Sequence, residues 1–376
     1  MKILFISNYS QLYGANRSML TIIEHFKSKG HTVVLILPQK GEICKELEVK
    51  GIEYIIIKCF TQLYYFKPNL KYLSLPLLAI YSYFKLNLLN RFARNFKPDL
   101  IYSNTSAENL GIKIAHKLGV KHISHIREFM DLDHGARFIF GNKAKMKYIN
   151  QSDGVIYVSK SVAEHVNMGL PLQVWQEVVY NGIQTIDWEY KEKKILDEIH
   201  LGVVGIFDPE KGQDLAIRLM PKVLEVYPKA KLHLWGDKKG KYKQSLLKMV
   251  KEFSLTPNVI FHGFEKDPNA IYGDMHVLLM CSKCEGFGRV TIEAMQRAIP
   301  VLGFNSGGTS ELVKDGFNGY LFNNSEDFIL GLKKLLSSNV EYNRIRKSAY
   351  EYSRSNYSTE LYCSRVENFV NKIMLL

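Results

Sequence analysis

Glu285 and Glu293 flank a turn that contains Gly286, Gly288 and Arg289. The turn follows a short apolar run of strand type and precedes a helical pattern. The two glycines remove side chains where the loop becomes a helix, so backbone N–H groups at the helix start are open to a negatively charged ligand. Arg289 falls in the first helical turn, where the helix dipole disfavours a cation, and a bound anion would reverse that effect. The pattern predicts a phosphate cradle.

The spacing of the two carboxylates suggests a separate task for each. Glu285 precedes the predicted helix and Glu293 lies one to two turns inside it. At about 1.5 Å per helical residue plus the loop, their separation is roughly that between the ribose and the sugar of a nucleotide-sugar. One carboxylate could accept hydrogen bonds from sugar hydroxyls and the other from ribose hydroxyls. The alternative is that Glu285 caps the helix and Glu293 is a surface residue.

The residues around this turn carry a longer pattern. A Glu-Gly-Phe-Gly loop and a Glu-Ala-Met helix are followed in order by Pro300-Val301, 307–311, 315–316 and 319–321. These segments resemble the E-x7-E region of the family 4 (GT4) retaining glycosyltransferases, which have the two-domain GT-B fold. The resemblance implies that Glu285 contacts hydroxyls of the donor sugar, that Glu293 holds the ribose, and that the amides around Phe287–Val290 receive the diphosphate.

A second segment resembles the G-R-L-x-x-x-K-G pattern of the same family. It begins at Gly205, and Lys211 matches the lysine that neutralises the diphosphate, but Ile206 stands where the family has arginine. We hypothesise that Arg289 supplies the missing charge. The resemblance alone places the nucleotide base against backbone groups near Gly263–Phe264.

The first half of the chain offers a glycine loop and a histidine. Gly14 and Asn16 open the first predicted helix, and the resemblance implies that this loop lies under the sugar diphosphate, which only a residue without a side chain permits at Gly14. The loop is not a G-x-G-x-x-G, which disfavours dinucleotide binding. The resemblance also places His125, at the end of a predicted strand, near the transferring carbon, with His122 as the weaker candidate. Arg127-Glu128 either form a structural ion pair or touch the acceptor.

We assign the catalytic roles to His125, Glu285 and Lys211. No carboxylate nucleophile is evident near the predicted anomeric carbon, so retention suggests front-face attack through an oxocarbenium-like state, with the leaving diphosphate stabilised by Lys211 and the helix amides. Charge supplied by the protein removes the need for a divalent cation, and we expect neither a metal nor another cofactor. The single Asp-x-Asp triplet, Asp131–Asp133, is assigned to a loop.

Apolar runs of strand length alternate with helical patterns along the whole chain, which is typical of parallel sheets covered by helices. We predict an α/β protein of the GT-B type with two doubly wound, Rossmann-like domains whose carboxyl strand ends face a cleft. Its parts are an acceptor-side domain (1–180), a linker (181–198), a donor domain (199–358) and a C-terminal helix (359–376) that can cross back to the first domain. The predicted strands are 2–7, 32–37, 53–57, 100–103, 122–126 and 154–158, then 200–207, 231–235, 259–261, 277–280, 300–303 and 319–322.

The composition limits the classes of partner that the protein is expected to bind. The chain has 376 residues and a formal net charge of +13, which suits anionic partners, but no nucleic-acid-binding module is recognisable. Five cysteines, an odd number, indicate reduced thiols in the cytoplasm, and the lone C-x-x-C at Cys281 and Cys284 lacks a second ligand pair for zinc. The N-terminal apolar run indicates a first strand rather than a signal peptide.

The segment 60–97 mixes aromatic and basic residues. This mixture suits the interface of an anionic membrane, which would make the protein peripheral on the inner face of the cell membrane and its acceptor lipid-linked. The alternative is that its apolar face belongs to the core.

These patterns together predict a retaining, metal-independent hexosyltransferase. Its donor is a nucleotide-sugar, with UDP favoured, and its acceptor a glycan or lipid-linked molecule of bacterial surface polysaccharide or glycoconjugate synthesis. Two rivals remain: a sugar-nucleotide-binding partner subunit with a weakened site, supported by Ile206, and a nucleotide-sugar epimerase on the same fold.

Overall fold

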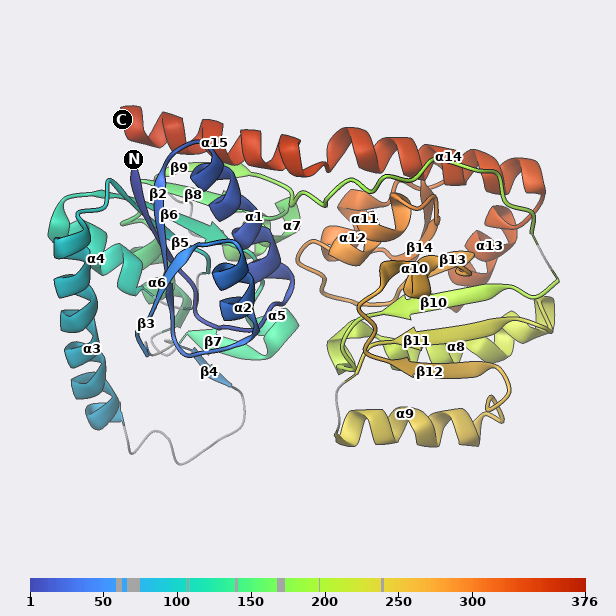
Figure 1. Cartoon of the computed structure of the whole chain (residues 1–376). Coiled ribbons are helices and arrows are strands. Elements are labelled where there is room, and N and C mark those ends of the chain that lie inside the picture. The colour runs from blue at the N-terminus through green and yellow to red at the C-terminus, as the bar shows by residue number, and fades with distance from the viewer. Residues whose placement is uncertain are drawn as a thin grey trace. The chain divides into compact units, whose positions relative to one another are not determined.

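The computed structural model describes residues 1–58, 63–65, 75–105, 107, 109–138, 141–167, 173–195, 197–237 and 240–376, with 63–65, 75–85 and 134 described by backbone alone. The chain forms two compact units (Figure 1). Unit 1 comprises residues 1–182 and 359–376, and unit 2 comprises residues 183–358.

Unit 1 is built on a seven-stranded sheet in the order β3-β2-β1-β5-β6-β8-β9, with every neighbouring pair parallel. Leu4, Ile6, Ile101 and their neighbours pack on one face of this sheet, and Ile3, Phe5 and Tyr102 pack on the other. The strands are β1 (Lys2–Ile6), β2 (Thr32–Leu37), β3 (Glu53–Ile56), β5 (Leu100–Ser103), β6 (Lys121–Ile126), β8 (Gly154–Tyr157) and β9 (Trp175–Val178), and a separate antiparallel pair joins β4 (Leu63–Tyr65) to β7 (Ala136–Phe138).

The helices of unit 1 include the C-terminal helix of the chain. Helix α15 packs against α1, and its Phe369 and Ile373 lie so close to Gly154 of β8 that a Cβ there would meet them at 2.8 and 2.7 Å. Its apolar stripe is therefore part of the unit 1 core. The helices are α1 (Gly14–Ser28), α2 (Glu42–Val49), α3 (Leu75–Phe96), α4 (Leu110–Leu118), α5 (Asp131–His134), α6 (Gly141–Ile149), α7 (Lys160–Val166) and α15 (Thr359–Leu375).

Unit 2 repeats the design with a six-stranded parallel sheet in the order β12-β11-β10-β13-β14-β15. Its strands are β10 (His200–Val204), β11 (Lys231–Trp235), β12 (Val259–Gly263), β13 (Val277–Met280), β14 (Val301–Phe304) and β15 (Gly319–Phe322). The 3-10 turn η2 (Pro209–Lys211) precedes its helices, which are α8 (Gln213–Val226), α9 (Lys241–Glu252), α10 (Pro268–Tyr272), α11 (Arg289–Met295), α12 (Gly307–Leu312), α13 (Ser325–Leu335) and α14 (Asn339–Asn356).

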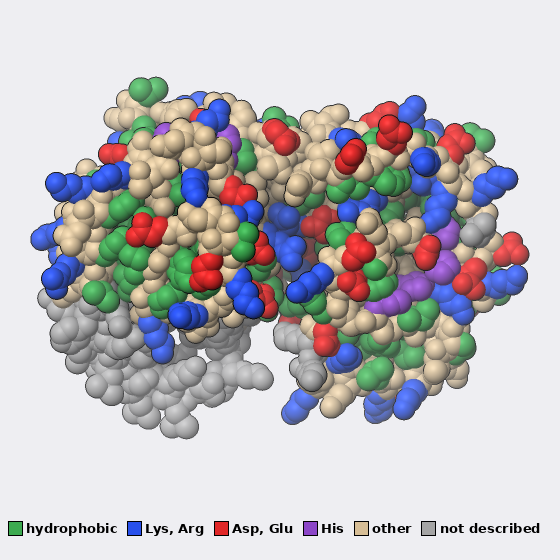
Figure 2. Space-filling model, viewed as in Figure 1, with side chains coloured by type: hydrophobic (Ala, Val, Ile, Leu, Met, Phe, Trp, Pro, Cys, Tyr) green, Lys and Arg blue, Asp and Glu red, His purple; other side chains and the backbone are tan. Residues whose placement is uncertain are grey.

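One face of the unit 2 sheet carries a row of histidines. Leu232 and Leu234 of β11 are buried in the core, so strand alternation directs His233 to the opposite face. His233 Nε2 lies 2.9 Å from His200 Nδ1, and His233 Nδ1 lies 2.8 Å from His262 Nε2. Figure 2 shows histidine side chains gathered on this unit. We call His200, His233 and His262 the histidine row.

The segment that enters unit 2 is fastened along α14. The Asn343 side chain bonds to the backbone of Lys193 in both directions, and Arg346 donates to Lys191 O. Tyr350 donates to Trp188 O at 2.9 Å. The stretch from Trp188 to Lys193 is thus anchored to unit 2 by side chains of one helix.

The predicted fold class is confirmed, and all twelve predicted strands form. One prediction is wrong: Asp131–Asp133 is not a loop but begins α5, because the Asp133 carboxylate accepts the backbone N–H groups of Phe129 and Met130 and caps the turn. Residues 60–62 and 66–74 of the segment 60–97 lie outside the described residues; in its described part, Leu89 and Ala93 are core residues. No described helix is long and apolar enough to span a membrane.

Candidate active site

The turn from Glu285 to Gly288 connects β13 to α11, and a pair of glycines at the start of α12 packs against it. Gly288 caps α11 with a φ of +92°, a conformation that favours glycine. Gly308 N donates to Glu285 O at 2.7 Å, and a Cβ on Gly307 or Gly308 would lie 2.7 Å from the carbonyl oxygen of Glu285 or Phe287. The predicted Gly286–Val290 cradle is therefore fixed by the start of α12.

Lys211 and Glu285 form an ion pair. Their Nζ and Oε2 atoms are 2.8 Å apart, and the side chains are 35% and 16% exposed. Lys211 is positioned by η2, where Ser282 Oγ donates to Glu210 O, and by Gly212, whose missing Cβ would lie 2.2 Å from Cys281 O. The sequence predicted both charged residues, and the structure brings them together from the carboxyl ends of β10 and β13.

The Glu293 carboxylate contacts Tyr272 and Arg289 in unit 2. The Tyr272 hydroxyl donates to its Oε2 at 3.2 Å, and Arg289 NH2 lies 3.8 Å from its Oε1. Tyr272 is buried, and burial together with the Glu293 charge raises its pKa well above the usual value, so it remains a donor. Sequence reasoning missed Tyr272, which lies on the short helix α10. Arg289 contacts Glu293 in this structure, so its proposed role toward a diphosphate stays a prediction.

Three glycines meet where β10, β11 and β12 end. Gly205 N donates to Trp235 O and Gly236 N donates to Gly263 O. A Cβ on Gly236 would lie 1.9 Å from Gly205 O, so this strand crossing requires glycine. Phe264 follows directly and is 65% exposed. The predicted Gly205 and Gly263–Phe264 therefore lie along one sheet edge, to which the structure adds Gly236.

His125 is buried at the carboxyl end of β6 in unit 1. Its Nδ1 lies 2.6 Å from the Tyr102 hydroxyl and 3.2 Å from Arg127 NH2. Because a guanidinium only donates, Nδ1 acts as the acceptor and the proton resides on Nε2. Burial and the Arg127 charge hold the His125 pKa well below its usual value, so the ring is neutral. Nε2 has no hydrogen-bond partner among the described residues.

His122, the weaker candidate, is a core residue. Its Nε2 bonds with Ser103 Oγ at 2.9 Å and its Nδ1 with Ser152 Oγ at 3.0 Å, and burial lowers its pKa to about 3. Both ring nitrogens are used within the protein, so this side chain has no free group for a ligand.

Arg127 is committed to a buried network. It donates through NH1 to Asn181 Oδ1 at 2.8 Å, through NH2 to the Tyr362 hydroxyl at 3.0 Å, and through Nε to Asn104 Oδ1. Among the described residues it makes no ion pair with Glu128, and the Glu128 Oε2 atom is buried without a partner. Burial raises the pKa of Glu128 to about 8, so this carboxyl is largely protonated at neutral pH.

Asn16 shapes the loop before α1. Its side chain is fully buried, accepts a bond from Ser7 Oγ and donates to the carbonyls of Tyr9 and Gln11. Both amide N–H groups are used inside the protein. Any contribution of Asn16 to donor binding would therefore come through the shape of this loop, which ends at Gly14, the first residue of α1.

Two parallel-sheet, Rossmann-like units, one of which carries a lysine–glutamate pair beside a glycine turn, constitute the architecture of a GT-B glycosyltransferase. Two family models match in succession, "Glycosyltransferase Family 4" over residues 13–186 and "Glycosyl transferases group 1" over residues 185–352. The chain belongs to the family 4 glycosyltransferases of the GT-B superfamily, which confirms the resemblance found in the sequence.

Curated relatives and solved structures agree with this family. The chain is 27% identical over 266 residues to a poly(ribitol-phosphate) alpha-N-acetylglucosaminyltransferase of Staphylococcus aureus, covering 70% of this chain and 52% of the relative. It is 32% identical over 241 residues to an uncharacterised glycosyltransferase of Methanocaldococcus jannaschii, covering 57% and 60%. The chain thus spans between half and two thirds of these relatives. The structure of HepE from Anabaena in complex with UDP-glucose has a TM-score of 0.80 at 20% identity, with 99% and 100% of the two chains covered.

Proposed function

We propose that the protein is a retaining glycosyltransferase that moves a hexose-type sugar from a nucleotide-sugar, with UDP as the favoured nucleotide, to a glycan or lipid-linked acceptor. The observation that carries this proposal is the ion pair between Lys211 and Glu285, 74 positions apart in the sequence and 2.8 Å apart in unit 2. The family and its UDP-glucose-bound structural neighbour support the class of donor.

In this mechanism donor binding separates Lys211 from Glu285, and each side chain contacts the donor instead. The diphosphate takes the Lys211 ammonium and the amides of the Gly286–Val290 turn, which frees Glu285 to accept bonds from sugar hydroxyls. Glu293, oriented by Tyr272, takes the ribose hydroxyls. Lys211 then stabilises the charge that develops on the leaving diphosphate as the acceptor attacks from the same face. We propose that this protein charge replaces a divalent cation.

His125 contributes a fixed donor rather than a base. Its neutral ring holds the proton on Nε2, the one polar atom of the ring that no described residue engages. This N–H is suited to donate to an oxygen of the sugar or the leaving group. A general base would instead need a ring nitrogen with a free lone pair, and Nδ1 is already occupied.

Turnover of UDP-glucose and related donors tests the proposal. We expect Lys211→Ala and Glu285→Gln each to lower turnover at least about 100-fold, because each removes a charge that acts at the reacting centre. Lys222→Ala is the matched control, since Lys222 forms a 2.7 Å ion pair with Glu326 on the surface of the same unit. Normal turnover in both site variants would refute the assignment.

Ile206 favours one rival, a sugar-nucleotide-binding partner subunit with a weakened site. It stands where the family has arginine, is 36% exposed beside Gly205, and adds no charge. Slow hydrolysis of the donor without acceptor would support the transferase, whereas tight UDP binding with no turnover under any condition would support the binding subunit. Conversion of the donor to an epimer would indicate the epimerase instead.

The place of the reaction in the cell is also part of the proposal. We place the reaction in the cytoplasm, and flotation with vesicles of anionic lipid tests whether the protein is also peripheral on the membrane. Binding to the vesicles would favour a lipid-linked acceptor, and no binding would favour a soluble glycan acceptor.

A further inference from the structure

Glu128 lies at the edge of the unit 1 sheet, two residues beyond the end of β6 at Ile126. Its place in the sequence is compatible with two roles, an ion pair with Arg127 or contact with the acceptor. The Arg127 guanidinium bonds instead to amide and hydroxyl oxygens and to the ring of His125. Among the described residues, contact with the acceptor is therefore the role that the fold leaves for Glu128.

The Glu128 Oε2 atom is buried and has no hydrogen-bond partner among the described residues. His125 Nε2 and Asn8 Oδ1 share this condition. Asn8 follows β1, the other two residues end or follow β6, and β5 lies between these strands in the sheet. The carboxyl ends of parallel strands meet at one edge, where ligands bind in parallel α/β proteins. Because a buried polar atom without a partner is costly, three of them at one edge indicate a place for polar groups of a ligand.

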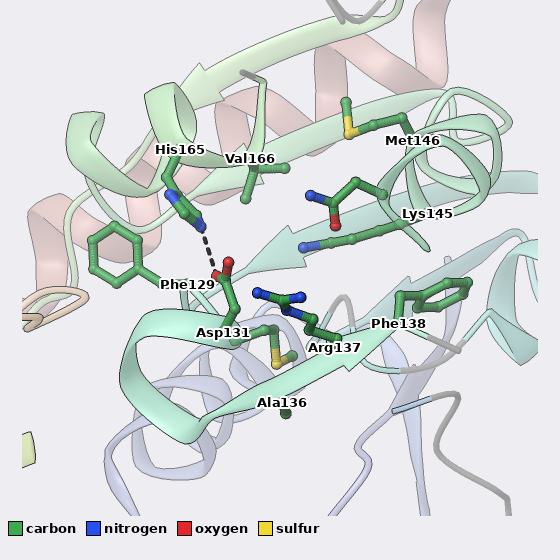
Figure 3. Close-up of a pocket in the computed structure, with 11 residues that line it drawn as sticks. Phe129, Asp131, Ala136, Arg137, Phe138, Lys145, Met146, His165 and Val166 are labelled. Carbon is green, nitrogen blue, oxygen red and sulfur yellow. Dashed lines mark hydrogen bonds and ion pairs between the residues drawn. The ribbon is translucent and has the colours of Figure 1, made fainter. Parts of the chain in front are cut away.

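The backbone that follows Glu128 is held by side chains of α5 and α7. The Asp133 carboxylate accepts two backbone N–H groups, one of them from Met130. Asp131 Oδ1 lies 2.7 Å from His165 Nε2, an interaction drawn in Figure 3. Met130 has a φ of +78°, which L side chains rarely adopt, and residues in such conformations concentrate at functional sites. Glu128 thus presents its carboxyl from a fixed stretch of chain.

The Glu128 carboxyl is mostly protonated at neutral pH. Burial raises its pKa to about 8, and the charge of Asp133 adds to this effect, whereas the charges of Arg127 and Lys145 oppose it. These groups come from α5, from the residue before Glu128 and from α6, and the Tyr9 hydroxyl after β1 also lies within reach of the Glu128 charge. Cations are therefore close to this carboxyl, but burial outweighs them. A protonated carboxyl has both an O–H donor and a carbonyl acceptor.

We propose that Glu128 binds a hydroxyl group of the acceptor through an uncharged carboxyl, whose O–H donates to the hydroxyl oxygen and whose carbonyl oxygen accepts from the hydroxyl. This inference rests on the proposed transferase function and assigns an acceptor-binding residue to it. His125 keeps its proposed place beside the donor. An ionised Glu128 would lose the donating half of this contact, so the site selects a neutral hydroxyl by hydrogen bonding rather than by charge.

Hydrolysis of UDP-glucose and related donors tests this role without the natural acceptor, because water then takes the place of the acceptor hydroxyl. We expect Glu128→Met to lower hydrolysis at pH 7 about tenfold or more, and Glu128→Gln, whose amide also donates and accepts, to restore most of it. UDP affinity should not change. Glu164→Met is the matched control, because Glu164 is exposed on α7. Unchanged hydrolysis in folded Glu128→Met, or an equal loss in Glu164→Met, would overturn the inference.

The pH profile distinguishes an uncharged carboxyl from a general base. Glu128 loses its proton as the pH rises through about 8, so hydrolysis by the wild type should fall between pH 7 and pH 9 relative to Glu128→Gln. Parallel profiles of the two proteins would contradict the proposal. A wild-type rate that rises over this range, with an inactive Glu128→Gln, would show a base and would also overturn it.

Stability separates a ligand-binding role of Glu128 from a role in holding the fold. Removal of a carboxyl whose buried oxygen has no described protein partner should not destabilise the chain. The melting temperature of Glu128→Met should therefore equal or exceed that of the wild type, and a clear decrease would assign Glu128 to the fold. If the wild type binds no UDP and hydrolyses no donor, the proposed function fails, whereas normal hydrolysis in Glu128→Met contradicts this inference alone.

Discussion

The two units prepare their candidate site residues in opposite ways. In unit 1, His125 is held by Tyr102 and Arg127 in a closed network, and it presents one fixed N–H. In unit 2, Lys211 and Glu285 are partly exposed and paired with each other. Burial produces a fixed neutral donor in unit 1, whereas the charges that must change partners in unit 2 stay near solvent, where separating them costs little.

Removal of Arg127 has the largest expected effect and tests the buried network of unit 1. Arg127→Met leaves Asn104, Asn181 and Tyr362 without their buried donor, and we expect unfolding free energy to fall by about 3 kcal/mol or more. Urea denaturation followed by fluorescence measures the loss. Arg218→Met, at a side chain 57% exposed on unit 2, is the control and should change little. Equal stability of the two variants would show that these buried hydrogen bonds contribute little to the stability of the fold.

Removal of the Tyr272 hydroxyl has a smaller expected effect and tests the donor site of unit 2. Tyr272→Phe removes the hydroxyl that orients Glu293 but keeps the buried ring, so UDP affinity should fall three- to tenfold with little change in stability. Calorimetric titration with UDP measures the effect. Tyr227→Phe, at a partly buried tyrosine of the same unit outside the site, should bind UDP normally. If Tyr272→Phe also binds normally, Glu293 does not depend on this contact.

Acid gives the smallest of these effects and acts on both units. The folded pKa of His122 is about 3 and that of His233 about 4, both below the ordinary value of 6.5. Both histidines therefore take up a proton at a higher pH in the unfolded chain than in the folded chain. Their contribution to stability is complete above about pH 6.5 and is lost as the pH falls toward 4 for His233 and toward 3 for His122. At pH 5.5 we expect a loss of about 1 kcal/mol from His122 alone. Urea titrations at pH 7.5 and 5.5 measure it, and His122→Gln should flatten the slope; a slope unchanged by that variant would contradict the assignment.

The sequence predicted the strands, the glycine turn and the charged pair because these depend on local patterns and on a family motif. It missed β9, whose Trp-Gln-Glu-Val sequence lacks a buried apolar run because it lies at the sheet edge. It also missed Tyr272 and the Arg127 network, whose partners lie up to 235 positions away and follow only from the folded chain. The ion pair suggested for Arg127 and Glu128 does not form in the described structure for a related reason. Neighbouring positions in the sequence do not by themselves direct two side chains toward each other.

The histidine row has a direction. Glu198 Oε1 lies 3.2 Å from His200 Nε2, and the contacts of the row are all satisfied when His200, His233 and His262 each donate through Nε2 toward Glu198. This order makes His262 Nδ1 the acceptor at the exposed end of the row, and no described residue donates to it. An incoming proton can enter there without disturbing any bond, whereas protonating His233 first would force His262 to change tautomer. A proton added at His262 therefore keeps the order of donors and acceptors in the row, whereas one added at either inner ring reverses part of it.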